Sequence, residues 1–242
     1  MGGRLGGKTA LVTGSTSNIG RAIATAFAAE GVHVIVSGRN GERGAAVVGE
    51  IRAPGGRADF VEADLDGSAA VSDRLAEEAT RVLGGCIDIL VNNAGILPGS
   101  TTPDTDEKTF DRVYAVNVKA PYFLTAALAP AMVRAGGGAV INLGSWLARL
   151  GIPVGTLYSS TKGAVETLTW AWAAEFGPQG VRVNAIAPGV VVPPARVARW
   201  APSASRSQSW AVPGVGSGWP PGAPSTSPVS SQYRSMRGSP AS

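Results

Sequence analysis

The segment Tyr158–Lys162, which reads YSSTK, carries the pair of side chains best suited to acid–base chemistry. Residues four apart lie on the same face of a helix, so Tyr158 and Lys162 can serve one site. A carbonyl that receives a hydride needs a proton on its oxygen, and a free tyrosine, with a pKa of about 10, exchanges protons poorly at neutral pH. A lysine cation nearby lowers that pKa by stabilising the phenolate. The spacing indicates proton transfer to a carbonyl, although an unrelated Tyr/Lys pair on an amphipathic helix would look the same.

A second functional signal is the segment TGSTSNIG, which follows a strand pattern and opens a helix pattern. Gly14 permits a tight turn, and Gly20 permits close helix–strand contact. The helix N-terminus offers N–H donors and a positive dipole end to a phosphate. Asn18 lies in the same turn, and asparagine is the next best residue after glycine in a left-handed backbone conformation. The segment predicts a dinucleotide-binding turn, with an ordinary strand-to-helix turn as the alternative.

The end of the second expected strand bears on the choice of cofactor. It reads Ser37, Gly38, Arg39, Asn40, without the acidic residue that would bind the ribose 2′-hydroxyl of NAD. Arg39 can pair bidentately with a 2′-phosphate, and its charge does not titrate. This favours NADP(H) over NAD(H), with NAD(H) and a simply solvated Arg39 as the alternatives.

The elements that must position these residues alternate between strand and helix patterns. Valine- and isoleucine-rich runs predict buried parallel strands at 8–14, 33–38, 58–64, 87–95, 138–145 and 181–189. Amphipathic runs predict helices at 19–30, 41–53, 68–83, 106–134 and 156–176. The alternation predicts an α/β doubly wound parallel sheet, the Rossmann fold, over residues 1–192.

Several motifs occur in the order typical of one family. From about Leu5 to Val192 the chain resembles the short-chain dehydrogenases/reductases, including those of 3-oxoacyl reductase type. The resemblance implies a carbonyl–alcohol oxidoreductase in which Tyr158 is the general acid or base and Lys162 lowers its pKa and binds the nicotinamide ribose. It also implies that Ser145 orients the substrate oxygen and that Asn117 supports a water relay to Lys162.

The same resemblance implies a set of cofactor contacts. NNAG (92–95) would support the sheet and line the cofactor pocket, DL (64–65) would meet the adenine, and PG (188–189) would lie beside the nicotinamide. Each also has a plain interpretation, as a strand end, a helix cap or a turn. The expected cofactor-binding residues are Gly14, Ser15, Thr16, Ser17, Asn18, Ile19, Gly20, Arg39, Asp64, Leu65, Asn92, Ala94, Gly95, Tyr158, Lys162, Pro188 and Gly189.

Composition excludes several other classes of function. Cys86 and His33 are the only residues of their types, so neither a disulfide nor the usual zinc site is expected, and no metal is predicted. No apolar run suits a membrane span and no leader pattern precedes the first strand, so we expect a cytoplasmic protein with no membrane partner. Residues 1–192 carry a net charge of −1, so no specific nucleic-acid partner is expected.

Residues 193–242 depart from this pattern. They contain nine Pro, twelve Ser, five Gly and five Arg, with no Lys, Asp or Glu, which is typical of disorder. An out-of-frame reading of the codons for residues 232–238 permits Val-Pro-Val-Asp-Ala-Gly, which resembles the closing strand of the family. We therefore hypothesise a frameshift near codons 190–200.

This departure affects the predicted function. The sequence after Val192 shows no pattern for the final helix and strand of the family, so it does not indicate which small-molecule carbonyl or alcohol is the substrate. The resemblance implies a homo-oligomer, and in the family those elements form a subunit interface that the altered ending would remove. The alternative function is a catalytically impaired nucleotide-binding or interaction protein.

Overall fold

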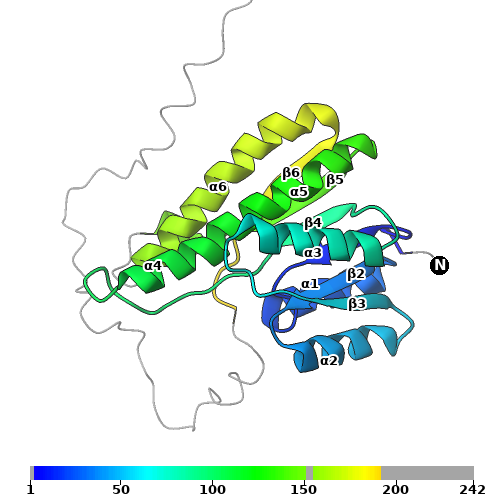
Figure 1. Ribbon diagram of the computed structural model, residues 1–242, viewed down its shortest axis with the longest axis horizontal. Helices are drawn as coiled ribbons and strands as arrows, with labels where there is room; N and C mark the ends of the chain where they lie inside the picture. The colour runs from blue at the N-terminus through cyan, green and yellow to red at the C-terminus, as the bar shows by residue number, and fades with distance from the viewer. Residues whose placement is uncertain (1–2, 151–154, 192–242) are drawn as a thin grey trace, which may run out of the picture. The chain divides into compact units, whose positions relative to one another are not determined.

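The computed structural model describes residues 3–150 and 155–191, and within them a parallel β-sheet is the central feature (Figure 1). All neighbouring strands pair in parallel, in the order β3-β2-β1-β4-β5-β6. The fold confirms the predicted doubly wound parallel sheet. The strands of the described chain are β1 (Thr9–Val12), β2 (His33–Gly38), β3 (Arg57–Glu62), β4 (Ile89–Asn92), β5 (Gly138–Leu143) and β6 (Val181–Ile186).

Helices cover both faces of the sheet, because successive strand residues point to opposite sides and both sides are apolar. On one face, Leu11 and Leu90 share a buried cluster with residues of α3, α5 and α6. On the other face, Ala10 and Val12 pack with residues of α1 and α2. The helices are α1 (Asn18–Ala29), α2 (Gly41–Arg52), α3 (Ala69–Val82), α4 (Glu107–Tyr114), α5 (Ala120–Arg134) and α6 (Thr156–Phe176), with short 3₁₀ turns at η2 (Trp146–Arg149) and η3 (Gly177–Gln179).

The strand order reverses at β1, which lies between β2 and β4. The segments that follow β1 and β4 lie side by side there, since the Thr13 amide donates to the Val91 carbonyl at 3.0 Å. In open α/β sheets, a ligand-binding crevice forms beyond the carboxyl ends of the strands at such a reversal. The topology therefore places a candidate site between the β1–α1 turn and the loop after β4.

The predicted helix at 106–134 is wrong in one respect. The chain forms α4 and α5, with a five-residue π-helical segment, η1 (Ala115–Lys119), between them. Here the Ala120 amide bonds the Ala115 carbonyl, five residues back, so the backbone is wider than in an α-helix. Such segments occur frequently at functional sites, and Asn117 lies in this one.

Several predicted boundaries also differ from the structure. The bounds of β2 and α6 agree with the prediction, but the other five strands each end two or three residues earlier than predicted. The residues after these strands leave the ladder to form the loops of the site. No helix in the described ranges is long and apolar enough to span a membrane. The predicted tail at 193–242, with its missing strand and helix, lies outside the described residues.

Candidate active site and cofactor cleft

The turn between β1 and α1 is held close to the loop after β4. Gly14 has a φ of +63°, and a Cβ there would lie 2.8 Å from the Cα of Ala94. At Gly20 a Cβ would overlap the Asn93 side chain and the Gly14 carbonyl. Asn18 has a φ of +48° and is the only residue other than glycine with a positive φ in the described chain. Asn18 thus adopts the left-handed conformation that the sequence predicts for it.

Hydrogen bonds fasten this turn to the β4 loop. The Asn93 side-chain amide donates to the carbonyls of Thr13 at 2.8 Å and Gly14 at 3.1 Å. The Thr13 hydroxyl accepts from the main-chain amides of Asn93 and Ala94, each at 3.0 Å. Asn93 therefore fixes the turn, although it is not among the predicted site residues. The NNAG motif contained the signal, because it offers two asparagines.

Two of the predicted contact residues lie behind the cleft wall. The Ser15 side chain is fully buried; its hydroxyl donates to the Val12 carbonyl at 2.6 Å and accepts from the Ser37 amide at 2.9 Å. The Asn92 side chain is also buried and donates to Asn142 at 2.9 Å. Both side chains tie the sheet together, so the structure does not bring them to the cavity with the other predicted residues.

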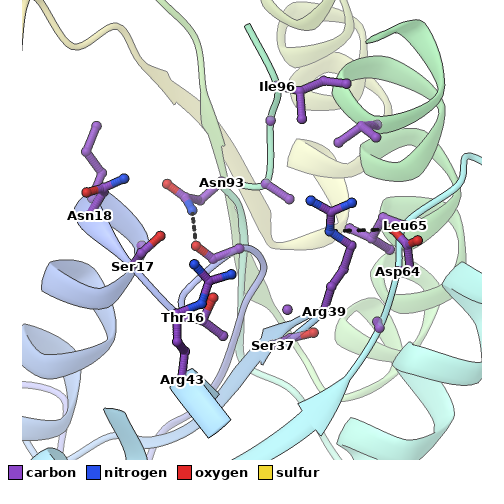
Figure 2. Close-up of a pocket in the computed structure, with 18 of the residues that line it drawn as sticks. Thr16, Ser17, Asn18, Ser37, Arg39, Arg43, Asp64, Leu65, Asn93 and Ile96 are labelled. Carbon is purple, nitrogen blue, oxygen red and sulfur yellow. Dashed lines mark hydrogen bonds and ion pairs between the residues drawn. The ribbon is translucent and has the colours of Figure 1, made fainter. Parts of the chain in front are cut away.

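A cavity of about 330 Å³ opens beside the turn (Figure 2). Its walls come from the β1–α1 turn, the end of β2, the β3–α3 loop, the β4 loop and α4. Figure 2 shows Thr16 beside Arg43, and Arg39 reaching toward Asp64. The predicted residues that line the cavity are Gly14, Thr16, Ser17, Asn18, Ile19, Gly20, Arg39, Asp64, Leu65, Ala94 and Gly95.

Two further arginines line this cavity and were not predicted, Arg43 and Arg112. Arg43 lies in the first turn of α2, where the Asn40 side chain caps the helix by accepting from its amide at 2.8 Å. The sequence did contain a signal for Arg43. It follows Arg39 by four residues, and the helix cap Asn40 lies between them. Arg112 lies on α4, and its distance in sequence from the other cavity residues meant that no motif indicated its place in the site.

A second cavity, of about 260 Å³, adjoins the first, because Ile19, Asn93, Gly95 and Ile96 line both. It brings together the predicted residues Ser145, Tyr158, Lys162, Pro188 and Gly189. The Gly144 amide donates to the Ile186 carbonyl at 2.8 Å, and the Trp146 amide to the Pro188 carbonyl at 3.3 Å. These bonds hold the loop after β6 beside Ser145.

Lys162 is a buried cation in the wall of the second cavity. It is 4% exposed, and its ammonium donates to the Leu143 carbonyl at 2.6 Å and lies 5.5 Å from the ring centroid of Tyr158. Burial lowers the pKa of Lys162 to about 8, because the charged form loses its hydration. The group therefore stays mainly protonated at neutral pH and titrates just above it.

Tyr158 experiences opposing effects. Burial raises the pKa of its phenol above the ordinary value, and hydrogen bonding with the Ser145 side chain acts in the other direction. The prediction that Lys162 lowers this pKa is wrong for the structure described here, because the pKa is raised and burial is the largest cause. The Ser145 hydroxyl also accepts from the Leu147 amide at 3.2 Å, which fixes its position at the start of η2.

Asn117 joins the β4 loop to α6. Its side-chain oxygen accepts from the Ile96 amide at 2.9 Å, and its side-chain nitrogen donates to the Ile96 carbonyl at 3.0 Å and the Thr161 hydroxyl at 3.1 Å. The Thr161 hydroxyl in turn donates to the Tyr158 carbonyl at 2.7 Å. Asn117 does not line either cavity described here, but it positions the helix that carries Tyr158 and Lys162.

Sequence comparison identifies the family of this site. The family model described as short chain dehydrogenase matches residues 8–203. The chain belongs to the short-chain dehydrogenase family. Sorbitol dehydrogenase of Cereibacter sphaeroides is 40% identical over 189 residues, which is 78% of this chain and 72% of that enzyme. As a member of this family, the chain is an oxidoreductase that acts on CH–OH and C=O groups of small molecules.

Solved structures of short-chain dehydrogenases have the same fold. A 3-oxoacyl (acyl-carrier-protein) reductase from Agrobacterium tumefaciens C58, with NADP bound, is 34% identical, with a TM-score of 0.75 over 81% of this chain and 74% of that one. A gluconate 5-dehydrogenase from Burkholderia cenocepacia J2315, in complex with NADP and tartrate, is 31% identical, with a TM-score of 0.74 over 83% of this chain and 78% of that one. These relatives support a nucleotide-dependent reaction.

The first cavity fits a dinucleotide. Gly14 and Gly20 leave space at the turn that side chains would fill, and α1 directs its N-terminus there. Ser17, Asn18 and Ile19 line the cavity at this point, and cationic groups line the end that faces α2. The chain thus offers the backbone cradle that a pyrophosphate requires.

Proposed function

We propose that this short-chain dehydrogenase interconverts a carbonyl and an alcohol with NADP(H) in preference to NAD(H), using Tyr158 as the proton donor or acceptor. One observation carries the proposal. The cavity lined by the glycine-rich turn and Arg39 adjoins the cavity that contains Ser145, Tyr158 and Lys162. A cofactor bound along the first cavity would therefore reach the acid–base group in the second.

The preference for NADP(H) is supported by charge. Arg39 and Arg43 both line the first cavity where β2 ends, and residues 37–40 contain no acidic side chain to accept a hydrogen bond from a ribose 2′-hydroxyl. Two guanidinium groups can bind a phosphate through charge-assisted hydrogen bonds. The reductase and the gluconate 5-dehydrogenase compared above were both solved with NADP, which supports this choice.

The chemistry assigned to the chain itself is proton transfer and orientation. The bound cofactor supplies or accepts the hydride. In reduction, the Tyr158 hydroxyl donates its proton to the substrate oxygen while Ser145 hydrogen-bonds that oxygen. The Lys162 ammonium stabilises the phenolate that remains, and in oxidation Tyr158 takes the proton back.

Two buried contacts hold the reacting groups in place. The bond from Lys162 to the Leu143 carbonyl fixes the ammonium at the end of β5. Asn117 holds the loop after β4 against α6, and we assign it the support of a proton relay toward Lys162. Both contacts reduce the reorganisation that the reaction requires.

A cofactor-dependent assay tests the proposal. Purified protein is mixed with NADPH or NADH and a panel of cyclic, acyclic and polyol-derived ketones, and cofactor oxidation is followed by absorbance. We expect turnover of at least one ketone and a higher kcat/KM for NADPH than for NADH. Cofactor binding without turnover of any ketone would instead support the catalytically impaired alternative, and a preference for NADH would contradict the cofactor assignment.

A further inference from the structure

Asp64, in the loop after β3, is shared by two arginines at the edge of the first cavity. Its carboxylate oxygen Oδ1 accepts from Nη2 of Arg112 at 2.7 Å and lies 3.7 Å from Nε of Arg39 (Figure 2 shows the second pair). Arg112 also donates from Nη1 to the Leu65 carbonyl at 3.1 Å. One guanidinium on α4 therefore binds both residues of the DL pair.

The two ion pairs differ in strength. Arg112 makes a hydrogen-bonded contact and is held at a second point by Leu65, and its side chain is 33% exposed. Arg39 is 62% exposed, and its separation from Asp64 is too long for a hydrogen bond. Exposed pairs with such geometry are weak. Asp64 is therefore bound mainly by Arg112, and Arg39 is only loosely held.

We infer that Arg112 is a specificity-determining residue, which neutralises and holds Asp64 so that Arg39 remains available to the 2′-phosphate of NADP(H). This inference rests on the proposed preference for NADP(H). Without Arg112, Asp64 would pair mainly with Arg39, which already lies 3.7 Å from its carboxylate. The negative charge of Asp64, no longer neutralised by Arg112, would also repel a phosphate bound to Arg39.

A purely structural role for Arg112 predicts a different pattern. Its bond to the Leu65 carbonyl supports the loop that also lines the cavity, and loss of that support would weaken NADPH and NADH alike. Loss of charge neutralisation would mainly weaken NADPH, since NADH has no 2′-phosphate. The ratio of the two dissociation constants therefore separates the two roles.

The test is a double-mutant cycle on cofactor binding. The full chain and the variants Arg112→Met, Asp64→Asn and Arg112→Met/Asp64→Asn are titrated with NADPH and with NADH at low ionic strength, with cofactor fluorescence as the signal. We expect Arg112→Met to raise the Kd for NADPH about tenfold and the Kd for NADH less than about twofold. Adding Asp64→Asn should restore most of the preference for NADPH, because no carboxylate then competes for Arg39.

Other outcomes would overturn the inference. Equal weakening of both cofactors by Arg112→Met, or failure of Asp64→Asn to restore the ratio, would show that Arg112 acts only on the loop. If Arg112→Met does not fold, Arg112→Lys keeps the charge and must keep most of the preference for the inference to stand. The preference of the wild-type chain is measured first. A wild-type chain without any preference for NADPH would refute the proposed cofactor itself.

Discussion

The ammonium of Lys162 donates a hydrogen bond to the main-chain oxygen of Leu143 across 2.6 Å, inside the second cavity. This bond joins α6, which carries the proposed acid–base pair, to the end of β5, two residues before Ser145. It also explains how a cation can be buried there, because a carbonyl replaces part of the lost hydration. The position of the ammonium beside Tyr158 is therefore set by the sheet as well as by the helix.

The pKa of Lys162 predicts the pH dependence of activity. Its pKa of about 8 is below its ordinary 10.5, so the cation that stabilises the phenolate is lost as the pH rises through 8. We expect kcat/KM for ketone reduction to fall on the alkaline side with an apparent pKa near 8. A pH profile measured with saturating NADPH checks this. Constant activity from pH 7 to 10 would contradict it.

The same pKa predicts how stability changes with pH. Between about pH 8 and 10.5 the unfolded chain binds the Lys162 proton and the folded chain does not, so this group makes the free energy of unfolding rise with pH. Below pH 8 the cost of burying the cation is present in full. Lys162→Met removes this cost, up to about 3 kcal/mol.

Thermal unfolding of Lys162→Met checks this sign. We expect the variant to gain more stability relative to wild type at pH 7 than at pH 10. Exposed Lys108, one of the few other lysines, provides the control Lys108→Met, for which no such difference is expected. An advantage that is larger at pH 10 than at pH 7 would contradict the assignment of the titrating group.

Arg39 and Arg43 should act together on the 2′-phosphate. Arg39→Gln and Arg43→Gln should each raise the Kd for NADPH by about fivefold to tenfold and leave the Kd for NADH within about twofold, because each removes one charged partner. Arg21→Gln is the matched control. Arg21, on α1, pairs with Glu50 of α2 and lines neither cavity. Loss of NADH affinity in parallel would show general damage to the cavity instead.

The left-handed residue Asn18 should tolerate glycine but not a branched side chain. With φ at +48°, Asn18→Gly relieves strain, whereas Asn18→Val should destabilise the fold by about 1–3 kcal/mol. Denaturant unfolding of both variants measures this difference. Equal stability of the glycine and valine variants would show that the turn does not require this conformation.

The sequence predicted the sheet and helix α6 well because their signals are local. Buried parallel strands are recognised by their valine and isoleucine runs, and α6 begins and ends at the predicted residues Thr156 and Phe176. The segment at Asn117 could not be predicted in the same way. Asn117 in this π-helical segment contacts Ile96 and Thr161, which are distant in sequence.

The site was predicted less completely than the fold, for a related reason. Ser15 and Asn92 belong to motifs that line the cleft, but their side chains turn into the sheet and form hydrogen bonds there. Arg112 reaches the cleft from α4, and only the folded arrangement brings it to Asp64. Motif positions indicate which loops form a site, whereas the direction of each side chain depends on its buried partners.

The substitution Tyr158→Phe tests the central claim most directly. It removes one hydroxyl and keeps the ring that packs beside Lys162. The measurement combines NADPH-dependent reduction of a ketone that the wild type accepts with NADPH binding by fluorescence. We expect turnover to be abolished and the Kd for NADPH to stay within about twofold of wild type, because the phenol acts on the substrate oxygen. Turnover retained at a rate close to that of wild type would contradict the assignment of Tyr158 as the proton donor.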